Sequence, residues 1–202
     1  MTKPVLTMFA GINGAGKSTL FELQKMKYNA DFGVRVCPDD ILMENEGDWE
    51  NYNDVYASGR KACKKINDCL EKKESFNWEY TLITDYVLKI MQKAKDAGYQ
   101  IKLNFILVDD LQTSLDRVAE RVKNGGHGIS EDMVRWRFKN QFMNMEKALP
   151  MLDIGVFFDN DEALQVVGFV TQEQPLVFFD KDTEITRDLL KKAKSTSTEM
   201  LK

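Results

Sequence analysis

Residues 11–18 read Gly-Ile-Asn-Gly-Ala-Gly-Lys-Ser, a full match to the pattern G-x-x-x-x-G-K-[ST]. An apolar segment, residues 4–10, precedes the match, and residues 19–23 continue in a helical pattern. The motif therefore lies between a short buried strand and a helix, the setting that a phosphate-binding loop needs. Its glycines let backbone N–H groups turn inward around phosphate oxygens, where a Cβ would block the approach. A strand and helix joined in this way constrain the chain to an α/β fold.

The loop supplies the first group of expected ligand-binding residues. Lys17 has the length to reach the β- and γ-phosphates, and the hydroxyl of Ser18 can take a place on Mg²⁺. The helix that starts at Lys17 adds the positive end of its dipole beneath the same oxygens. We therefore expect a nucleoside triphosphate and Mg²⁺ as ligands. The residues expected to contact the triphosphate are Gly11, Asn13, Gly14, Ala15, Gly16, Lys17, Ser18 and Thr19.

Composition argues against several classes of function. The 202 residues carry a formal net charge of −4, whereas a nucleic-acid-binding domain presents a basic face. No apolar run approaches the roughly 20 residues of a membrane helix, and the N-terminal apolar segment leads into the loop rather than to a signal cleavage site. The three cysteines are odd in number and lack a C-x-x-C pair. We expect a cytoplasmic protein that binds neither nucleic acid nor membrane.

Strand and helix patterns alternate along the chain, which predicts a mostly parallel sheet with helices on both faces, a three-layer P-loop fold. After residue 160 the alternation stops, and two apolar segments are expected to pair as a hairpin before a helix that starts at Thr183 and a frayed tail. We expect a kinase-like domain over 1–162 and an extension over 163–202 that packs on it. The expected strands are 4–10, 33–36, 76–81, 101–108, 154–158, 164–170 and 176–179. The expected helices begin at Lys17 and cover 54–72, 85–97, 111–122 and an apolar stripe from Val134 to Leu149, capped by Ser130.

Polar residues follow three of the expected strands, where ligands bind in parallel sheets. Asp39 and Asp40 follow the second strand, and Asp109 follows the fourth in the position of a Walker B acid. Glu79 and Thr81 lie two residues apart at the end of the third strand, so both can face the same site. Each pattern has a structural alternative: Asp39 or Asp40 as a helix cap, and Glu79 with Thr81 as ordinary polar residues of an edge strand.

Several of these segments resemble the zeta-toxin family of bacterial P-loop kinases, in the branch without a fused antitoxin. The resemblance runs from residue 8 to about 160, in the family's order. Its most specific part is Arg-Val-x-x-Gly-Gly-His-x-Ile, which ends at Ile129. The resembling segments are Phe9–Thr19, Pro38–Ile41, Trp78–Leu82, Arg117–Val122, Gly125–Ile129, Val134–Phe138 and Asp159–Asn160.

The resemblance implies transfer of the γ-phosphate of ATP to a hydroxyl of a small molecule, and some family members phosphorylate UDP-N-acetylglucosamine. Asp39 matches the family's catalytic base, and Glu79 with Thr81 matches the pair that holds the acceptor or a water on Mg²⁺. A separate antitoxin protein is an implied partner. The alternative to this function is a P-loop ATPase or switch that hydrolyses the nucleotide and uses Asp109.

The resemblance also implies two arginines that neutralise charge on the γ-phosphate. Arg121 matches the first, and Arg137 fits the second better than Arg135, so Lys17, Asp39, Arg121 and Arg137 form the expected catalytic set. Two neighbouring features have alternative roles. His127, the only histidine, either contacts phosphate or substrate or links two helices, and Asp159–Asn160 either orients the adenine or stabilises a turn. Trp49, Tyr52 and Tyr56 are expected mainly in the core, with lining of the acceptor pocket as the alternative.

Overall fold

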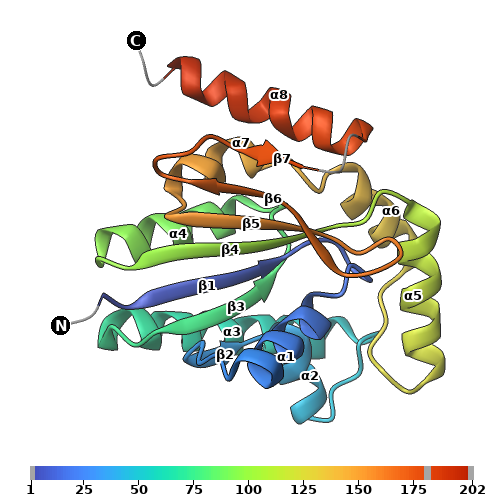
Figure 1. The fold of residues 1–202 in the computed structure, drawn as a ribbon. Helices are drawn as coiled ribbons and strands as arrows, with labels where there is room; N and C mark the ends of the chain where they lie inside the picture. The colour runs from blue at the N-terminus through green and yellow to red at the C-terminus, as the bar shows by residue number, and fades with distance from the viewer. Residues whose placement is uncertain (1–2, 180–182, 200–202) are drawn as a thin grey trace.

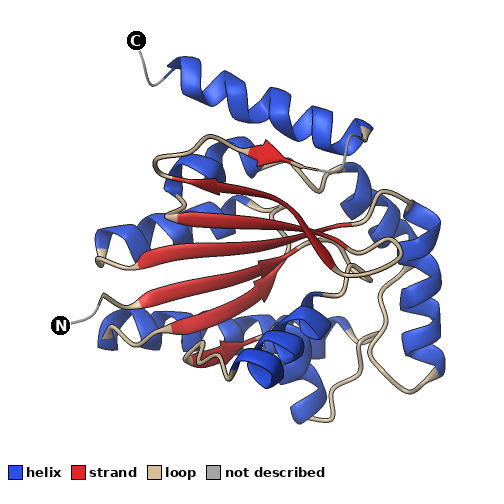
Figure 2. Cartoon of the chain, viewed as in Figure 1, coloured by secondary structure: helices blue, strands red, loops and turns tan. Residues whose placement is uncertain are grey.

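A seven-stranded sheet forms the centre of the computed structural model, which describes residues 3–179 and 183–199 (Figures 1 and 2). The strand order is β2-β3-β1-β4-β5-β6-β7. The first five strands of this order run parallel, and β6 and β7 are antiparallel to their neighbours. The mostly parallel α/β fold predicted from the sequence is confirmed. The strands are β1 Val5–Ala10, β2 Val34–Val36, β3 Phe76–Tyr80, β4 Gln100–Leu107, β5 Ile154–Asp159, β6 Gln165–Thr171 and β7 Val177–Phe178.

Helices cover both faces of the sheet, as the alternation of patterns predicts. Buried side chains of α3, α4 and α7 pack on one face, and those of α1 pack on the other. Over the described residues, none of the helices is long and apolar enough to cross a membrane. The helices are α1 Lys17–Tyr28, α2 Pro38–Glu44, α3 Tyr52–Lys72, α4 Asp85–Asp96, α5 Leu111–Lys123, α6 Glu131–Lys139, α7 Met145–Ala148 and α8 Glu184–Glu199, with a 3₁₀ turn at Leu149–Met151.

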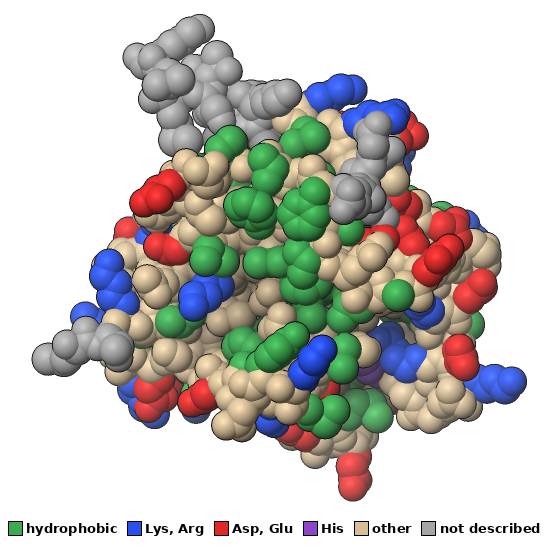
Figure 3. All heavy atoms as spheres, in the orientation of Figure 1, with side chains coloured by type: hydrophobic (Ala, Val, Ile, Leu, Met, Phe, Trp, Pro, Cys, Tyr) green, Lys and Arg blue, Asp and Glu red, His purple; other side chains and the backbone are tan. Residues whose placement is uncertain are grey.

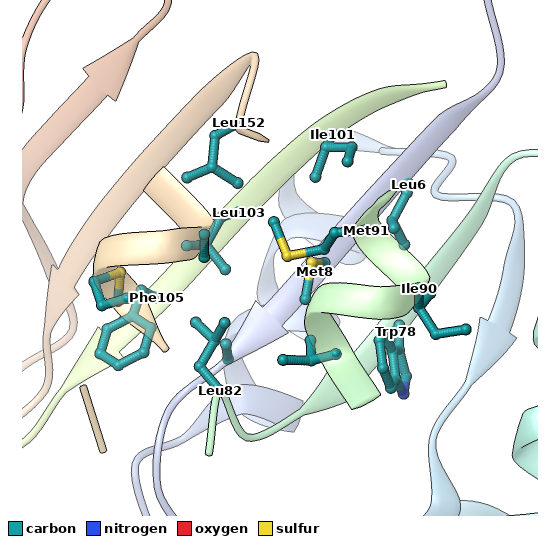
Figure 4. Close-up of a cluster of buried hydrophobic side chains, with 14 of the residues drawn as sticks. Leu6, Met8, Trp78, Leu82, Ile90, Met91, Ile101, Leu103, Phe105 and Leu152 are labelled. Atoms are coloured by element: carbon teal, nitrogen blue, oxygen red, sulfur yellow. The ribbon is translucent and has the colours of Figure 1, made fainter. Parts of the chain in front are cut away.

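Successive side chains of β1 and its neighbouring strands point to opposite faces of the sheet, so one face packs in the main core and the other faces the phosphate-binding loop. Met8 pairs in register with Trp78 on β3 and Leu103 on β4. These three side chains therefore share a face, and Figure 4 shows them in one cluster with Ile90 and Met91 of α4. The following pair, Phe9 with Glu79, points to the opposite face, which α1 covers. The sheet pleat thus directs Glu79 away from the main core and toward the phosphate-binding loop.

The helix expected to continue from Ser130 to Leu149 is broken, and that prediction is wrong. Ser130 caps α6 as predicted, because its side chain accepts a hydrogen bond from the N–H of Met133. The helix ends at Lys139, since the side chain of Asn140 donates to the carbonyl of Trp136 at 2.7 Å and competes for the last turn. Beyond it, Phe142 lies in a turn, Met145 in α7 and Leu149 in the 3₁₀ turn, and all three still pack on the core.

The C-terminal segment extends the sheet. β6 and β7 pair as the predicted hairpin, and β6 also pairs with β5, so the hairpin continues the central sheet. On the face covered by α1, several apolar side chains of these strands remain exposed, as the green patch in Figure 3 shows; they are Ile154, Val166, Phe169 and Val177. Helix α8 runs to Glu199, and the end of the tail that was expected to fray, residues 200–202, lies outside the described residues. The three cysteines are free, as expected.

Candidate active site

The phosphate-binding loop joins β1 to α1 and holds three glycines with positive φ. Gly11, Gly14 and Gly16 have φ values of 147°, 78° and 96°. A Cβ on Gly11 would lie 2.6 Å from the carbonyl oxygen of Ile106, and one on Gly14 would lie 2.7 Å from that of Ser114. Neither backbone oxygen can yield, so the loop depends on glycine for both its conformation and its packing. Backbone N–H groups of a loop in this conformation can converge on an anion.

Two distant residues support the loop from behind. The side chain of Asn160, which follows β5, donates to the carbonyl of Ala15 at 2.8 Å. Arg117 of α5 donates to the carbonyl of Gly14 at 3.4 Å and to that of Asp161 at 3.0 Å. The sequence leaves two roles open for Asn160, orienting the adenine or stabilising a turn. These contacts favour the second role, because Asn160 holds the phosphate-binding loop. The loop is therefore held in shape by the fold.

Lys17 lies at the start of α1 with its ammonium turned back on the loop. Its Nζ donates to the carbonyl of Ile12 at 3.0 Å. Burial lowers the pKa of Lys17, against the opposing charges of Glu79 and Asp39. A buried ammonium with a single short hydrogen bond has unused donors, which an anionic phosphate would satisfy.

Ser18, Glu79 and Arg35 form a chain of polar contacts beside the loop, in which Glu79 is buried and Ser18 is exposed. The hydroxyl of Ser18 donates to the Glu79 carboxylate, with distances of 2.9 and 3.1 Å to its two oxygens. Arg35 on β2 donates to Glu79 Oε2 at 2.6 Å and to Asp40 Oδ2 at 3.0 Å. Its guanidinium also stacks 4.0 Å from the ring centroid of Phe21. Burial by itself would lower the pKa of the Arg35 guanidinium. The negative charge and the hydrogen bond of Glu79 outweigh that effect, so the pKa is raised.

Arg35 is the residue of this site that sequence reasoning misses. Arg35 pairs in register with Asn77 and so shares a face with Glu79, two residues further along β3, but this pairing depends on the order of the strands and leaves no local signal in the sequence. The same contacts show the role of Asp40. It lies inside α2, forms an ion pair with Arg35 of β2, and does not cap its own helix.

Asp39 lies in the first turn of α2 and faces His127. Asp39 Oδ2 and His127 Nε2 are 2.9 Å apart, an ion-pair distance. Burial alone would raise the pKa of Asp39, but His127 and Lys17 outweigh it and hold the pKa below its ordinary value. Helix α2 has no side-chain cap, so Asp39 is free of the capping role. The glycine-rich turn of residues 125–128, which we call the lid turn, thus places His127 against the carboxylate expected to act as base.

The three arginines considered from the sequence take different places. Arg137 donates to Asn13 Oδ1 in the phosphate-binding loop at 2.8 Å, and burial lowers its pKa. Burial also lowers the pKa of Arg121, and its Nε and Nη2 are buried with no hydrogen-bond partner among the described residues. Arg135 is half-exposed and pairs with Glu131 at 3.5 Å, away from the loop. Buried guanidinium donors without partners are a liability unless a ligand meets them.

A cavity of about 830 Å³ connects these groups. Asn13, Lys17, Asp39, Glu79 and Arg137 line it, and Thr81 joins them just beyond the end of β3. The structure therefore brings together most of the residues expected to act in catalysis and acceptor binding. Arg121 is not part of the lining; it packs beneath the lid turn, where a Cβ on Gly126 would lie 2.7 Å from its Cγ.

Other expected residues lie outside this arrangement. Asp109 does not line the cavity, and its N–H donates to Asp161 Oδ1 at 2.9 Å. Trp49 lines the cavity, but Tyr52 and Tyr56 are 76% and 55% exposed and stack on each other. Placement of these two tyrosines in the core is therefore wrong. They occupy the outer side of α3, which the sequence pattern of that helix does not distinguish.

Comparisons with known proteins agree with this geometry. A sequence model described as zeta toxin matches residues 1–184, most of the chain. The chain belongs to the zeta toxin family. A Haemophilus influenzae protein, described as uncharacterized, is 33% identical over 131 residues, which cover 64% of this chain and 89% of that protein.

Solved structures share the fold of this zeta toxin family member at low identity. The PezAT chromosomal toxin–antitoxin system of Streptococcus pneumoniae contains a chain that is 17% identical, with a TM-score of 0.63 over 98% of this chain and 87% of that one. A complex of AvrRxo1-ORF1 and AvrRxo1-ORF2 with ATP contains a chain that is also 17% identical, with a TM-score of 0.65 over 93% of this chain and 64% of that one.

Proposed function

We propose that the protein is an ATP-dependent kinase that phosphorylates a hydroxyl of a small molecule. The observation that carries this proposal is the shared cavity, in which the carboxylate of Asp39 faces the same space as the Lys17 ammonium of the P-loop. A base beside the phosphate site is what transfer to a hydroxyl requires. Membership of the zeta toxin family supports the same reaction class.

In the proposed reaction the acceptor oxygen attacks the γ-phosphorus of ATP. The new O–P bond forms as the bond from that phosphorus to the β–γ bridging oxygen breaks, and ADP leaves. Asp39 accepts the proton of the hydroxyl. Lys17 and Arg137, which line the cavity, neutralise charge on the phosphoryl oxygens, and Arg121 adds positive charge from outside the lining. Charge neutralisation is the main task in a reaction with little covalent demand on the protein. Thr81, which lines the same cavity as Glu79, helps to position the acceptor.

The donor set beside the loop fits Mg²⁺. The hydroxyl of Ser18 and the buried carboxylate of Glu79 already lie within hydrogen-bond distance, and hard oxygen donors are what Mg²⁺ prefers. Among the described residues no group of three or more His, Cys, Asp or Glu could hold a metal by itself. Mg²⁺ usually keeps several waters and nucleotide oxygens, so two protein oxygens suffice. Bound there, the ion would neutralise charge on the β- and γ-phosphates.

The alternative of hydrolysis without transfer receives less support. It would use Asp109 as the acid beside the metal, and Asp109 does not line the cavity. It would also leave Asp39 without a role, although that carboxylate is the one that faces Lys17 and His127.

Phosphoryl transfer by the purified protein tests the proposal. The assay incubates wild type and Asp39→Asn with Mg²⁺, ATP and a protein-free bacterial metabolite extract, and detects products heavier by one phosphoryl group by mass spectrometry. UDP-N-acetylglucosamine is assayed separately as a pure acceptor. We expect a product with wild type and a loss of about a hundredfold or more in its rate with Asp39→Asn. Asp116→Asn, which changes an exposed carboxylate on α5, is the matched control. ATP hydrolysis that is insensitive to Asp39→Asn, without any phosphorylated product, would contradict the proposal.

We infer a separate antitoxin chain as the protein partner. The support is membership of the zeta toxin family and the toxin–antitoxin system that contains one structural neighbour. A stable complex that lowers ATP binding, measured with the product of a neighbouring gene, is the expected result.

A further inference from the structure

The carboxylate of Asp39 is held from one side by the imidazole of His127. Nε2 of His127 lies 2.9 Å from Asp39 Oδ2, and among the described residues no other side chain comes within hydrogen-bond or ion-pair distance of this carboxylate. The His127 side chain is 17% exposed, whereas the Asp39 side chain is 46% exposed. Both residues line the cavity. One side of the carboxylate is therefore fixed, and the other remains open to a ligand.

The lid turn holds His127 in place through a glycine on each side of it. A Cβ on Gly126 would lie 2.7 Å from Cγ of Arg121, and one on Gly128 would lie 2.8 Å from the indole of Trp49. The N–H of Gly126 also donates to the carbonyl of Arg121 at 2.9 Å. The turn is thus packed closely against α5 and against the segment between α2 and α3, which only glycine allows. The position of the imidazole is therefore built into the fold.

An imidazole suits the task of orienting a carboxylate. Nε2 can donate a hydrogen both in the neutral ring and in the imidazolium, so the contact does not require a charged histidine. Nε2 of His127 is buried and has no aligned hydrogen-bond partner among the described residues, which leaves Asp39 Oδ2 as the acceptor within its reach. A carboxylate with one oxygen held in this way cannot rotate freely. A base that is fixed within reach of a hydroxyl contributes more to the rate than one that turns.

We propose that His127 is a positioning residue, which holds Oδ2 of Asp39 so that Oδ1 can take the proton of the acceptor hydroxyl. This inference rests on the proposed kinase function and adds to it a residue that acts through the base. As the new O–P bond forms, the hydroxyl proton passes to Asp39, and His127 keeps its own proton throughout. The role differs from both alternatives that the sequence leaves open for His127, a contact with phosphate or substrate and a link between helices.

The same contact keeps the base ionised. Burial alone would raise the pKa of Asp39, and the hydrogen bond and charge of His127, followed by the charges of Lys17 and Arg121, lower it. Removal of the imidazole should therefore raise the pKa of Asp39, so that the carboxylate becomes protonated at a higher pH than in wild type. The other titratable or charged groups near this carboxylate are Cys37 before α2, Asp40 on α2, Glu79 on β3 and Arg137 on α6.

A matched pair of variants at residue 127 tests the role of the donor. His127→Gln keeps an N–H donor near the place of Nε2, and His127→Leu has a similar size without any donor. We expect His127→Leu to lower the rate of product formation about 10- to 100-fold, and His127→Gln to stay within about threefold of wild type. Affinity for a non-hydrolysable ATP analogue, measured by calorimetry, should be equal in the three proteins, because the contact of His127 is with Asp39 and not with the P-loop.

The pH dependence of the rate separates positioning from a structural role. Wild type should keep its rate as pH falls from about 8 to 5. His127→Leu should lose rate within that range, because the pKa of Asp39 rises, and His127→Gln should lose less. A residue that only supports the turn would lower the melting temperature and the affinity for the ATP analogue, and would leave the pH dependence as in wild type.

A spectroscopic measurement follows the contact without turnover. His127 is the only histidine of the chain, so its imidazole gives a single set of signals in the NMR spectrum of histidine-labelled protein. Asp39→Asn should shift these signals at neutral pH, and Asp116→Asn, on the exposed side of α5, should not.

The outcomes separate the two proposals. If wild type transfers phosphate and His127→Leu matches it in rate and pH dependence, or if His127→Gln is as slow as His127→Leu, the positioning role is overturned and the kinase function stands. If wild type binds ATP but forms no product, the kinase function fails. The spectra then decide by themselves whether His127 holds Asp39, and imidazole signals that ignore Asp39→Asn overturn the contact.

Discussion

The cavity has two ends that are built by different means: a P-loop end around Lys17, and an acceptor end. The acceptor end is lined by Leu42, Trp49, Val55, Ile83, Met133 and Trp136. At the P-loop end, polar groups are fixed by partners that lie far away in sequence, such as Asn160 on Ala15 and Arg35 on Glu79. At the acceptor end, the wall consists of helix starts and a glycine-rich turn, and Trp136 is 49% exposed. In the proposed kinase, nucleotide binding would therefore be specified by contacts of the fold itself, whereas acceptor choice would depend on side chains of helices and loops that line the cavity.

Removal of the loop ammonium gives the largest expected effect. Lys17→Met should lower kcat/KM for phosphoryl transfer by about a thousandfold, because no other group replaces the charge at that position. Lys25→Met removes an exposed lysine of the same helix and should leave kcat/KM unchanged. Equal losses in the two variants would show that α1, and not the ammonium, is the sensitive element.

Arg35 tests whether the P-loop end depends on support from β2. Arg35→Met should lower kcat by roughly 10- to 100-fold and raise the Mg²⁺ concentration needed for half-maximal activity, because Glu79 loses a charge-assisted hydrogen bond. Calorimetric titration of Mg²⁺ with a non-hydrolysable ATP analogue measures the same change without turnover. Arg60→Met, at an exposed position of α3, is the control. An unchanged Mg²⁺ concentration for half-maximal activity would show that Arg35 contributes packing only and does not position Glu79.

The support of the loop by Asn160 should have a moderate effect. Asn160→Ala removes the hydrogen bond to Ala15 and should raise the KM for ATP about tenfold, with a loss of about 1 kcal/mol in unfolding free energy. Asn67→Ala, exposed on α3, serves as the comparison in both the kinetic assay and chemical denaturation. A stability loss without a change in KM would mean that the loop keeps its shape without this bond.

The acceptor end should respond in the opposite way. Trp136→Ala should raise the KM for the acceptor roughly fivefold and leave the KM for ATP unchanged, because the residue lines the cavity and, among the described residues, its side chain makes no hydrogen bond to the loop. Steady-state kinetics with each substrate varied in turn separates the two values. A change in the KM for ATP would place the indole on the nucleotide side instead.

The smallest expected effect concerns pH. The pKa of Asp39 is held below its ordinary value of about 3.9, so the carboxylate is ionised throughout the neutral range. Its contribution to kcat/KM should therefore stay constant as pH falls from about 8 to 5 and be lost only below about 4. A profile of wild type against Asp39→Asn over this range measures the contribution. An acidic limb near pH 6 that disappears in Asp39→Asn would contradict this prediction.

The sequence predicts the P-loop end far better than the acceptor end, for physical reasons. The loop motif, the strands and the position of Glu79 follow from local pattern, because glycine conformation and strand alternation act over a few residues. The contact between Arg35 and Glu79 depends on which strands become neighbours, and no local signal records that order. The break at Asn140 was missed because the apolar stripe continues across it, although the chain does not remain helical. The outward face of Tyr52 and Tyr56 likewise depends on how α3 is rotated against the sheet.

The contact between Asn160 and Ala15 joins residues 145 positions apart in the chain. A ribosome delivers the P-loop early and Asn160 late, so a growing chain carries the nucleotide motif long before it carries the residue that supports it. Arg137, which reaches Asn13 in the same loop, is also synthesised well after that loop. The catalytic constellation therefore assembles only when most of the protein has been made. Under the proposed function, phosphoryl transfer would therefore begin only after residue 160 has been synthesised and has reached the loop.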